Sequence, residues 1–132
     1  MNITIDTSAL IAVLGNEASR QQIIEITEGY SLCAPVSVHW EIGNAFSAMF
    51  KSKRATLKQA KSALVAYREI PIKFIDIALE QTLEISHTLN IYAYDAYLIQ
   101  CAQQTGTSLL TLDKGLKSAA EKLGIDLLEI RQ

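Results

Sequence analysis

Two patterns of apolar residues alternate along the chain. Short, nearly continuous apolar runs predict strands that are buried on both faces. Longer segments, in which apolar residues recur every three or four positions, predict amphipathic helices. The expected strands cover residues 2–6, 30–35, 72–77, 107–113 and 125–130, and the expected helices cover residues 7–14, 17–28, 37–51, 56–70, 77–90, 93–105 and 114–123.

Local signals place several of these boundaries. Ser37 and Thr56 are good N-cap residues, and each precedes a helical pattern. Pro71 forces the chain out of a helix, and Gly106 ends another before an apolar run. Strands that alternate with helices require right-handed crossovers. We therefore expect an α/β fold, with a mainly parallel sheet of about four to five strands covered by helices on both faces.

Composition adds little to this fold class but limits the location and partners. The 132 residues fit one domain, spanning residues 1–132, and no apolar run approaches the ~20 residues of a membrane helix. Asp6, Thr7 and Ser8 interrupt the apolar start, so we expect no signal peptide and a cytoplasmic protein. A net charge of −2 gives no overall attraction to nucleic acid. The two cysteines, Cys33 and Cys101, are expected to be buried free thiols.

Aspartates follow three of the expected strands. Asp6 and Asp113 end strands at the edge where open α/β sheets bind ligands, but each could equally cap the helix that follows. Asp76 has the same setting, and we interpret it as a helix cap only.

Two further carboxylates lie within helices. Asp95 shares a helix face with Leu98 and Ile99, so it points inward and must either cap the helix or meet a cation. Glu41 lies at the margin of an apolar stripe, where a solvated position is the simpler interpretation. If all four carboxylates converge, their repulsion requires a hard cation such as Mg²⁺ or Mn²⁺, which also accepts phosphate oxygens.

Four motifs in order resemble the PIN-domain ribonucleases, particularly the short VapC-type toxins of bacterial toxin–antitoxin pairs. They are "IDTSALIAVL", "EIGNAF", "YDAYLIQCAQQTG" and "LLTLD". The resemblance implies a metal-dependent endoribonuclease whose catalytic metal ligands are Asp6, Glu41, Asp95 and Asp113. It further implies supporting roles for Thr7, Ser8, Asn44 and Thr111, RNA products with 5′-phosphate and 3′-hydroxyl ends, a VapB-like antitoxin partner and a homodimer. Some relatives carry another acidic residue after the last aspartate, where this chain has Lys114, Gly115 and Lys117, which leaves one or two metal ions open.

Candidate contacts to RNA are weaker signals. The basic residues Lys51, Lys53, Arg54, Lys114 and Lys117 could bind phosphates or form plain solvated surface. The aromatic residues Trp40, Tyr92, Tyr94 and Tyr97 could stack on bases, although packing in the core or an interface is the simpler prediction. His39 and His87 are isolated and receive no catalytic role.

Three other functions fit parts of the pattern. A haloacid-dehalogenase-like phosphatase would need an aspartate where Ser8 stands, and a response-regulator receiver would need an acidic pair near the first strand. A PIN-like module that only binds RNA or protein is the remaining alternative. The four acidic residues argue against it, because their repulsion has no use without a metal.

Overall fold

Residues 1–130 are described by a computed structural model. They form four strands and seven helices, in the order β1 (Asn2–Ile5), α1 (Thr7–Leu14), α2 (Arg20–Thr27), β2 (Ser31–Pro35), α3 (Val38–Lys51), α4 (Leu57–Glu69), β3 (Ile72–Ile75), α5 (Leu79–Leu89), α6 (Ala93–Thr105), β4 (Ser108–Leu110) and α7 (Lys114–Lys122).

The strands form one parallel sheet in the order β3-β2-β1-β4. Thr4 of the central strand β1 lies opposite Cys33 of β2 and Leu109 of β4. Ile3 and Ile5 are buried at 0% and 2% exposure, as expected for a strand covered on both faces. The expected α/β fold with a parallel sheet is thus confirmed.

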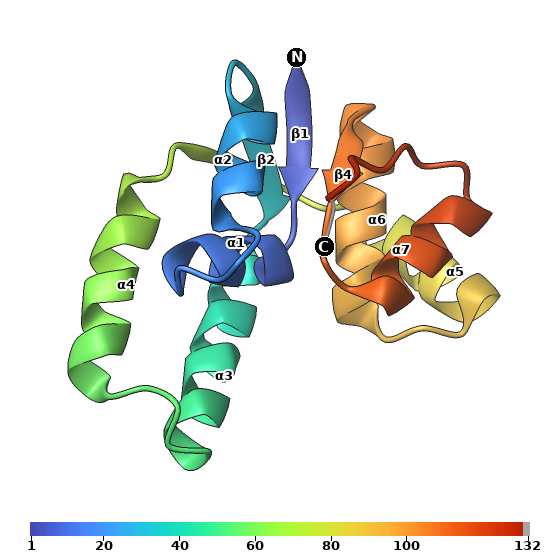
Figure 1. The fold of residues 1–132 in the computed structure, drawn as a ribbon. Helices are drawn as coiled ribbons and strands as arrows, with labels where there is room; N and C mark the ends of the chain where they lie inside the picture. Colours follow the sequence, from blue (N-terminus) through green and yellow to red (C-terminus); the bar gives the residue numbers. More distant parts are fainter. Residues whose placement is uncertain (131–132) are drawn as a thin grey trace.

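Helices cover the sheet on two sides (Figure 1). The helices α1, α2, α3 and α4 lie on one side, and α1 contacts the other three. The helices α5, α6 and α7 lie on the other side, where α6 contacts β1, β2 and β4. Helices α3 and α4 form a hairpin whose tip extends away from the sheet.

The core is built from the apolar faces of these layers. Leu98 and Ile99 of α6 are buried at 1% and 0% exposure beside the strand residues Leu109 and Leu110. Both cysteines are free and buried in this core, as expected. None of the helices within residues 1–130 is long and apolar enough to cross a membrane.

Helix caps explain several boundaries. Thr56 forms a capping box with Gln59, which fixes the start of α4. Gly106 ends α6 in the left-handed conformation, with φ of 64°, which a glycine adopts without steric cost. Ser37 occupies the N-cap position of α3, but its side chain makes no capping hydrogen bond.

Three expectations need correction. Residues 125–130 form only a single parallel bridge, between Leu109 and Leu127, and no full strand. Helix α2 begins at Arg20 and not at residue 17, because residues 17–19 form a turn. Asp76 does not cap α5, because residues 76–78 have no regular structure and Ala78 takes the N-cap position without a side-chain hydrogen bond.

Candidate metal centre

The site lies where the strand order reverses. After β1 the chain crosses to β2 on one side, whereas β4 occupies the other side of β1. Parallel sheets open a crevice at such a point, beyond the carboxyl ends of the two strands. Asp6 follows β1 and donates its backbone N–H to the Leu110 carbonyl at 3.1 Å, and Thr111 and Asp113 follow β4. The topology therefore brings residues 6 and 113 to the same crevice.

Asp6 is the most firmly held carboxylate of the site. It is 4% exposed and caps α1 by accepting the Ala9 N–H at 3.1 Å. The Ser8 hydroxyl donates to its Oδ1 at 2.8 Å, and the Thr111 hydroxyl donates to its Oδ2. Ser8 in turn accepts the Leu112 N–H at 2.9 Å, which ties the end of β4 to α1. The capping role that the sequence suggested is confirmed, and the charges of Asp6 and Asp113 still influence each other.

Glu41 enters the site from the first turn of α3. Its Oε2 accepts a hydrogen bond from the Thr7 hydroxyl at 2.9 Å. Its Oε1 is buried and has no hydrogen-bond partner in the described part of the chain. An unpartnered buried carboxylate oxygen is costly unless a further ligand or proton meets it. The solvated position considered from the sequence is therefore wrong for Glu41.

Asp95 and Asp113 complete the group. Asp95 is half-buried in the first turn of α6, whose N-cap is Tyr92, so Asp95 does not cap the helix. Asp113 is exposed and caps α7 by accepting the N–H groups of Gly115 at 2.8 Å and Leu116 at 3.1 Å. The inward position expected for Asp95 is confirmed.

Burial and repulsion by neighbouring carboxylates favour protonation of Asp6, Glu41 and Asp95. Burial, opposed by three hydrogen bonds, raises the pKa of Asp6 to about 6, and the charge of Asp113 adds to the rise. Burial raises the pKa of Glu41 to about 7, with further contributions from Asp6 and Asp95. The pKa of Asp95 is also raised, by burial and then by Asp113. Each carboxylate thus lies within the field of at least one other.

The donor set fits a hard divalent cation. Four carboxylates and nearby hydroxyls supply only oxygen ligands, the type that Mg²⁺ and Mn²⁺ prefer. The orphaned Glu41 Oε1 offers a free ligand atom, and a cation would offset the repulsion. Within residues 1–130, no group of three or more acidic, histidine or cysteine side chains already converges closely enough to hold one ion. The ligand set therefore stays a prediction, and binding requires side-chain adjustment.

The remaining predicted residues are spread more widely. Thr7, Ser8 and Thr111 lie in the hydrogen-bond network of the carboxylates, whereas Asn44 is exposed on α3. Lys114 and Lys117 lie in the first turn of α7, directly after Asp113. The other basic residues, Lys51, Lys53 and Arg54, lie at the far tip of the α3–α4 hairpin (Figure 1). At about 1.5 Å per helical residue, Lys51 is about 15 Å along α3 from Glu41.

A neighbouring cavity contains residues that the sequence interpretation assigned to packing. Trp40 and Tyr94 line it and are 65% and 52% exposed, so packing in the core was wrong for both, and packing in an interface stays a prediction. Tyr92 is 89% exposed and does not line this cavity. The position of Trp40 was visible in the sequence, because it lies opposite Val38 and Ile42 on the helix.

Comparison with known proteins gives a family and a set of related folds. The model of the PIN domain matches residues 3–122. VapBC2 from Rickettsia felis, solved with a DNA fragment from its promoter, aligns with a TM-score of 0.72 and 16% identity over 99% of this chain and 100% of that chain. VapC20 from Mycobacterium tuberculosis, described as cleaving the sarcin–ricin loop, has a TM-score of 0.66 and 14% identity over 98% and 99%.

A third structure comes from an archaeon. PAE2754 from Pyrobaculum aerophilum has a TM-score of 0.66 and 20% identity over 93% of this chain and 95% of that chain. A comparison with curated protein sequences finds no match. At these identities the solved structures establish a shared fold, and the domain match establishes the family.

Proposed function

Since this chain belongs to the PIN-domain family, we propose that it is an Mg²⁺- or Mn²⁺-dependent endoribonuclease and the toxin of a toxin–antitoxin pair. The proposal rests on the carboxylates of Asp6, Glu41, Asp95 and Asp113 at the switch point, the place between β1 and β4 where the strand order reverses. The pKa values of the first three are raised by burial and by neighbouring carboxylates. The fold that the chain shares with VapC20, a toxin described as cleaving an RNA loop, also supports it.

The proposed metal ligands are Asp6, Glu41, Asp95 and Asp113. Thr7 holds Glu41, and Ser8 and Thr111 hold Asp6, so the hydroxyls orient the ligands before metal arrives. Asn44, one turn after Glu41, orients a water or the substrate. When bound, the metal supplies an activated water and stabilises charge on the reacting phosphate. Water adds to phosphorus as the bond to the 3′ oxygen breaks, and the products carry 5′-phosphate and 3′-hydroxyl ends.

Basic residues supply the proposed contacts to the RNA backbone. Lys114 and Lys117 are placed beside Asp113 and suit the phosphates next to the cleaved bond. Lys51, Lys53 and Arg54 lie too far along the hairpin for that phosphate, and suit a distant part of a longer RNA.

Partners and location belong to the same proposal. A VapB-like antitoxin is supported by the fold shared with VapBC2 and, at a TM-score of 0.59, with a toxin–antitoxin complex from Klebsiella pneumoniae. A homodimer is supported by Leu83, an apolar residue of α5 that is 53% exposed and does not line the cavity beside Trp40. A toxin that cuts cellular RNA acts in the cytoplasm.

Cleavage of total bacterial RNA tests the proposal directly. Purified protein is incubated with Mg²⁺, Mn²⁺ or EDTA beside the variants Asp6→Asn, Asp95→Asn and Asp126→Asn, and the RNA ends are mapped. Asp126 is exposed and follows α7, outside the group of carboxylates, so its variant is the matched control. We expect metal-dependent cuts at a few sites, lost in the first two variants and kept in the third. Metal binding without any cut, in the presence of all cellular RNAs, would favour a silent binding module.

A further inference from the structure

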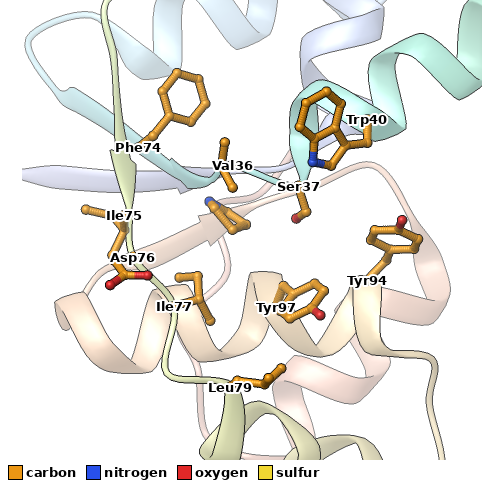
Figure 2. Close-up of a pocket in the computed structure, with 11 residues that line it drawn as sticks. Val36, Ser37, Trp40, Phe74, Ile75, Asp76, Ile77, Leu79, Tyr94 and Tyr97 are labelled. Atoms are coloured by element: carbon orange, nitrogen blue, oxygen red, sulfur yellow. The ribbon is translucent and has the colours of Figure 1, made fainter.

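A cavity near the starts of α3 and α6 is lined mainly by apolar and aromatic side chains. Its volume is about 610 Å³, and it lies between the starts of α3, α5 and α6 and the end of β3 (Figure 2). Trp40 and Phe74 contribute rings from one side, and Tyr94 and Tyr97 from the other. The cavity is therefore a space bordered by several flat aromatic surfaces.

The His39 ring packs against two of these aromatic residues, Trp40 and Phe74. The His39 ring lies 6.0 Å from Trp40 and 4.4 Å from Phe74 between centroids. The Tyr67 hydroxyl pairs with His39 Nδ1 at 2.8 Å and fixes this ring. Tyr94 and Tyr97 pack edge to face, with centroids 6.1 Å apart. These contacts orient the walls before any ligand enters.

One polar atom inside the cavity has no partner. Ser37 is 8% exposed, and its buried hydroxyl makes no hydrogen bond within residues 1–130. Figure 2 shows this hydroxyl pointing into the space between Trp40 and Tyr97. A buried hydroxyl of this kind costs stability unless a partner meets it, so a ligand with a hydrogen-bonding edge would satisfy it.

The charges around the cavity select the kind of ligand. Among residues 1–130, its lining contains no lysine, arginine or histidine, and Asp76 is the charged residue that lines it. A phosphate would therefore be repelled, whereas a flat, neutral heterocycle with polar edge atoms suits both the rings and the hydroxyl. The cavity and the carboxylates share two helices, because Trp40 precedes Glu41 on α3 and Tyr94 precedes Asp95 on α6.

We infer that this cavity binds one unpaired nucleobase of the RNA substrate, adjacent to the phosphate at the carboxylates. The base stacks on Trp40 or Tyr97 and hydrogen-bonds to the Ser37 hydroxyl. The inference rests on the proposed function for its substrate, and the bound base must lie outside a duplex, since neighbouring base pairs cover both of its faces there.

The single tryptophan of the chain provides a direct readout. Adenosine, cytidine and uridine are titrated into wild-type protein in EDTA, with ribose as the control that lacks a base, and Trp40 emission is followed. Uncharged nucleosides avoid repulsion by the carboxylates and cannot be cleaved. We expect saturable quenching by nucleosides and none by ribose. Ser37→Ala is expected to weaken the binding without lowering thermal stability, because the hydroxyl makes no hydrogen bond with residues 1–130.

Cleavage kinetics give a second, independent readout. Trp40→Leu is expected to raise KM for a single-stranded RNA at least about fivefold with kcat little changed, since base stacking contributes ~1 kcal/mol or more. Phe50→Leu is the matched control, because Phe50 is an exposed aromatic residue of the same helix that does not line the cavity.

The outcomes separate this inference from the proposed function. RNA cleavage with unchanged KM in Trp40→Leu, and no quenching by nucleosides, would overturn the base site and leave the nuclease. Quenching by nucleosides without RNA cleavage would support the base site and reject the nuclease. A third outcome is that Trp40 emission changes with protein concentration and not with nucleosides, and that sedimentation detects a dimer which Trp40→Leu abolishes. This outcome would show that a second copy covers the cavity, and it would overturn the inference.

Discussion

The buried carboxylates Asp6 and Glu41 lower the stability of the folded state when they are charged. Asp6 keeps three hydrogen bonds and is still harder to ionise than a free aspartate, with a pKa of about 6. Glu41 has one oxygen satisfied by Thr7 and one left without a partner. Functional sites commonly retain such unfavourable groups because the reaction needs them. At the residue scale, stability and the proposed chemistry therefore oppose each other.

Replacing Asp6 by asparagine should stabilise the metal-free protein. A pKa raised from 3.8 to about 6 means that the folded state disfavours the charged form. Asparagine removes the charge and can still cap α1, although it gives up one accepting oxygen. We expect Asp6→Asn to raise the free energy of unfolding by about 1–2 kcal/mol at pH 7.5 in EDTA, measured by urea denaturation.

The pH dependence provides the control for this prediction. Between its unfolded and folded pKa values Asp6 holds more protons in the folded chain, so Asp6 lowers the stability of the wild type as pH rises from about 4 to 6, and Glu41 extends this fall to about pH 7. Below that window Asp6 is protonated in both the folded and the unfolded state. The charge of Asp6 should then no longer contribute to the difference in unfolding free energy between wild type and Asp6→Asn. A variant that is less stable than wild type at pH 7.5 would show that the lost hydrogen bond outweighs the charge.

At the scale of elements, the same side chains serve as helix caps and as proposed ligands. Asp6 caps α1 and Asp113 caps α7, so a strand end, a helix start and a carboxylate coincide twice. The helix N-terminus accepts negative charge, which partly offsets the crowding of acids. Capping and metal binding are therefore compatible, and substitutions can separate them.

Two substitutions of Asp113 make this separation. Asparagine is as good an N-cap as aspartate, whereas alanine cannot accept the N–H groups of Gly115 and Leu116. We expect Asp113→Asn to keep the stability of the protein and lose RNA cleavage. Asp113→Ala should lose cleavage and about 1 kcal/mol of stability. Full cleavage by a stable Asp113→Asn variant would limit Asp113 to capping.

The sequence predicts elements well where local chemistry decides them. Thr56 with Gln59, Pro71 and Gly106 set helix ends by contacts or dihedral limits within a few residues, and all three boundaries agree with the structure. Residues 125–130 look like a buried strand, but they meet only the short strand β4 and form one bridge. Their pairing depends on tertiary contacts that an apolar pattern does not reveal.

The candidate site also combines features that local sequence predicts with features that depend on tertiary packing. The inward face of Asp95 followed from helical spacing, and Asp6 and Asp113 followed from their strand ends. The burial of Glu41 depends on α1 and α3 meeting, which places Thr7 beside it across 34 positions of sequence. The unpartnered Ser37 hydroxyl also depends on tertiary packing, because a serine at a helix start normally predicts a cap.

At the scale of the whole molecule, the charges are arranged unevenly. The net charge is −2, Asp6, Glu41, Asp95 and Asp113 lie within one another's electric field, and Lys51, Lys53 and Arg54 lie at the exposed tip of the α3–α4 hairpin. An RNA long enough to reach both regions would be held at the tip and cut at the crevice.

Salt dependence tests this arrangement. Affinity for a single-stranded RNA should fall with salt, with a slope in log–log form of about −0.7 for each phosphate neutralised. Replacing Lys51, Lys53 and Arg54 together by glutamine should make the slope shallower by up to about 2 for a long RNA. A short RNA that covers only the crevice should show no such change. An unchanged slope for the long RNA would make the hairpin tip plain solvated surface.

We expect Asp6, Glu41, Asp95 and Asp113 to bind a divalent metal. Calorimetric titration of Mn²⁺ at pH 7.5 into wild type, Asp6→Asn, Asp95→Asn and the control Asp126→Asn measures this without RNA or an antitoxin. We expect wild type and Asp126→Asn to bind with the same affinity, and the two site variants to bind at least about tenfold more weakly. Equal Mn²⁺ affinity in all four proteins, or no binding by wild type, would show that these carboxylates do not form a metal site.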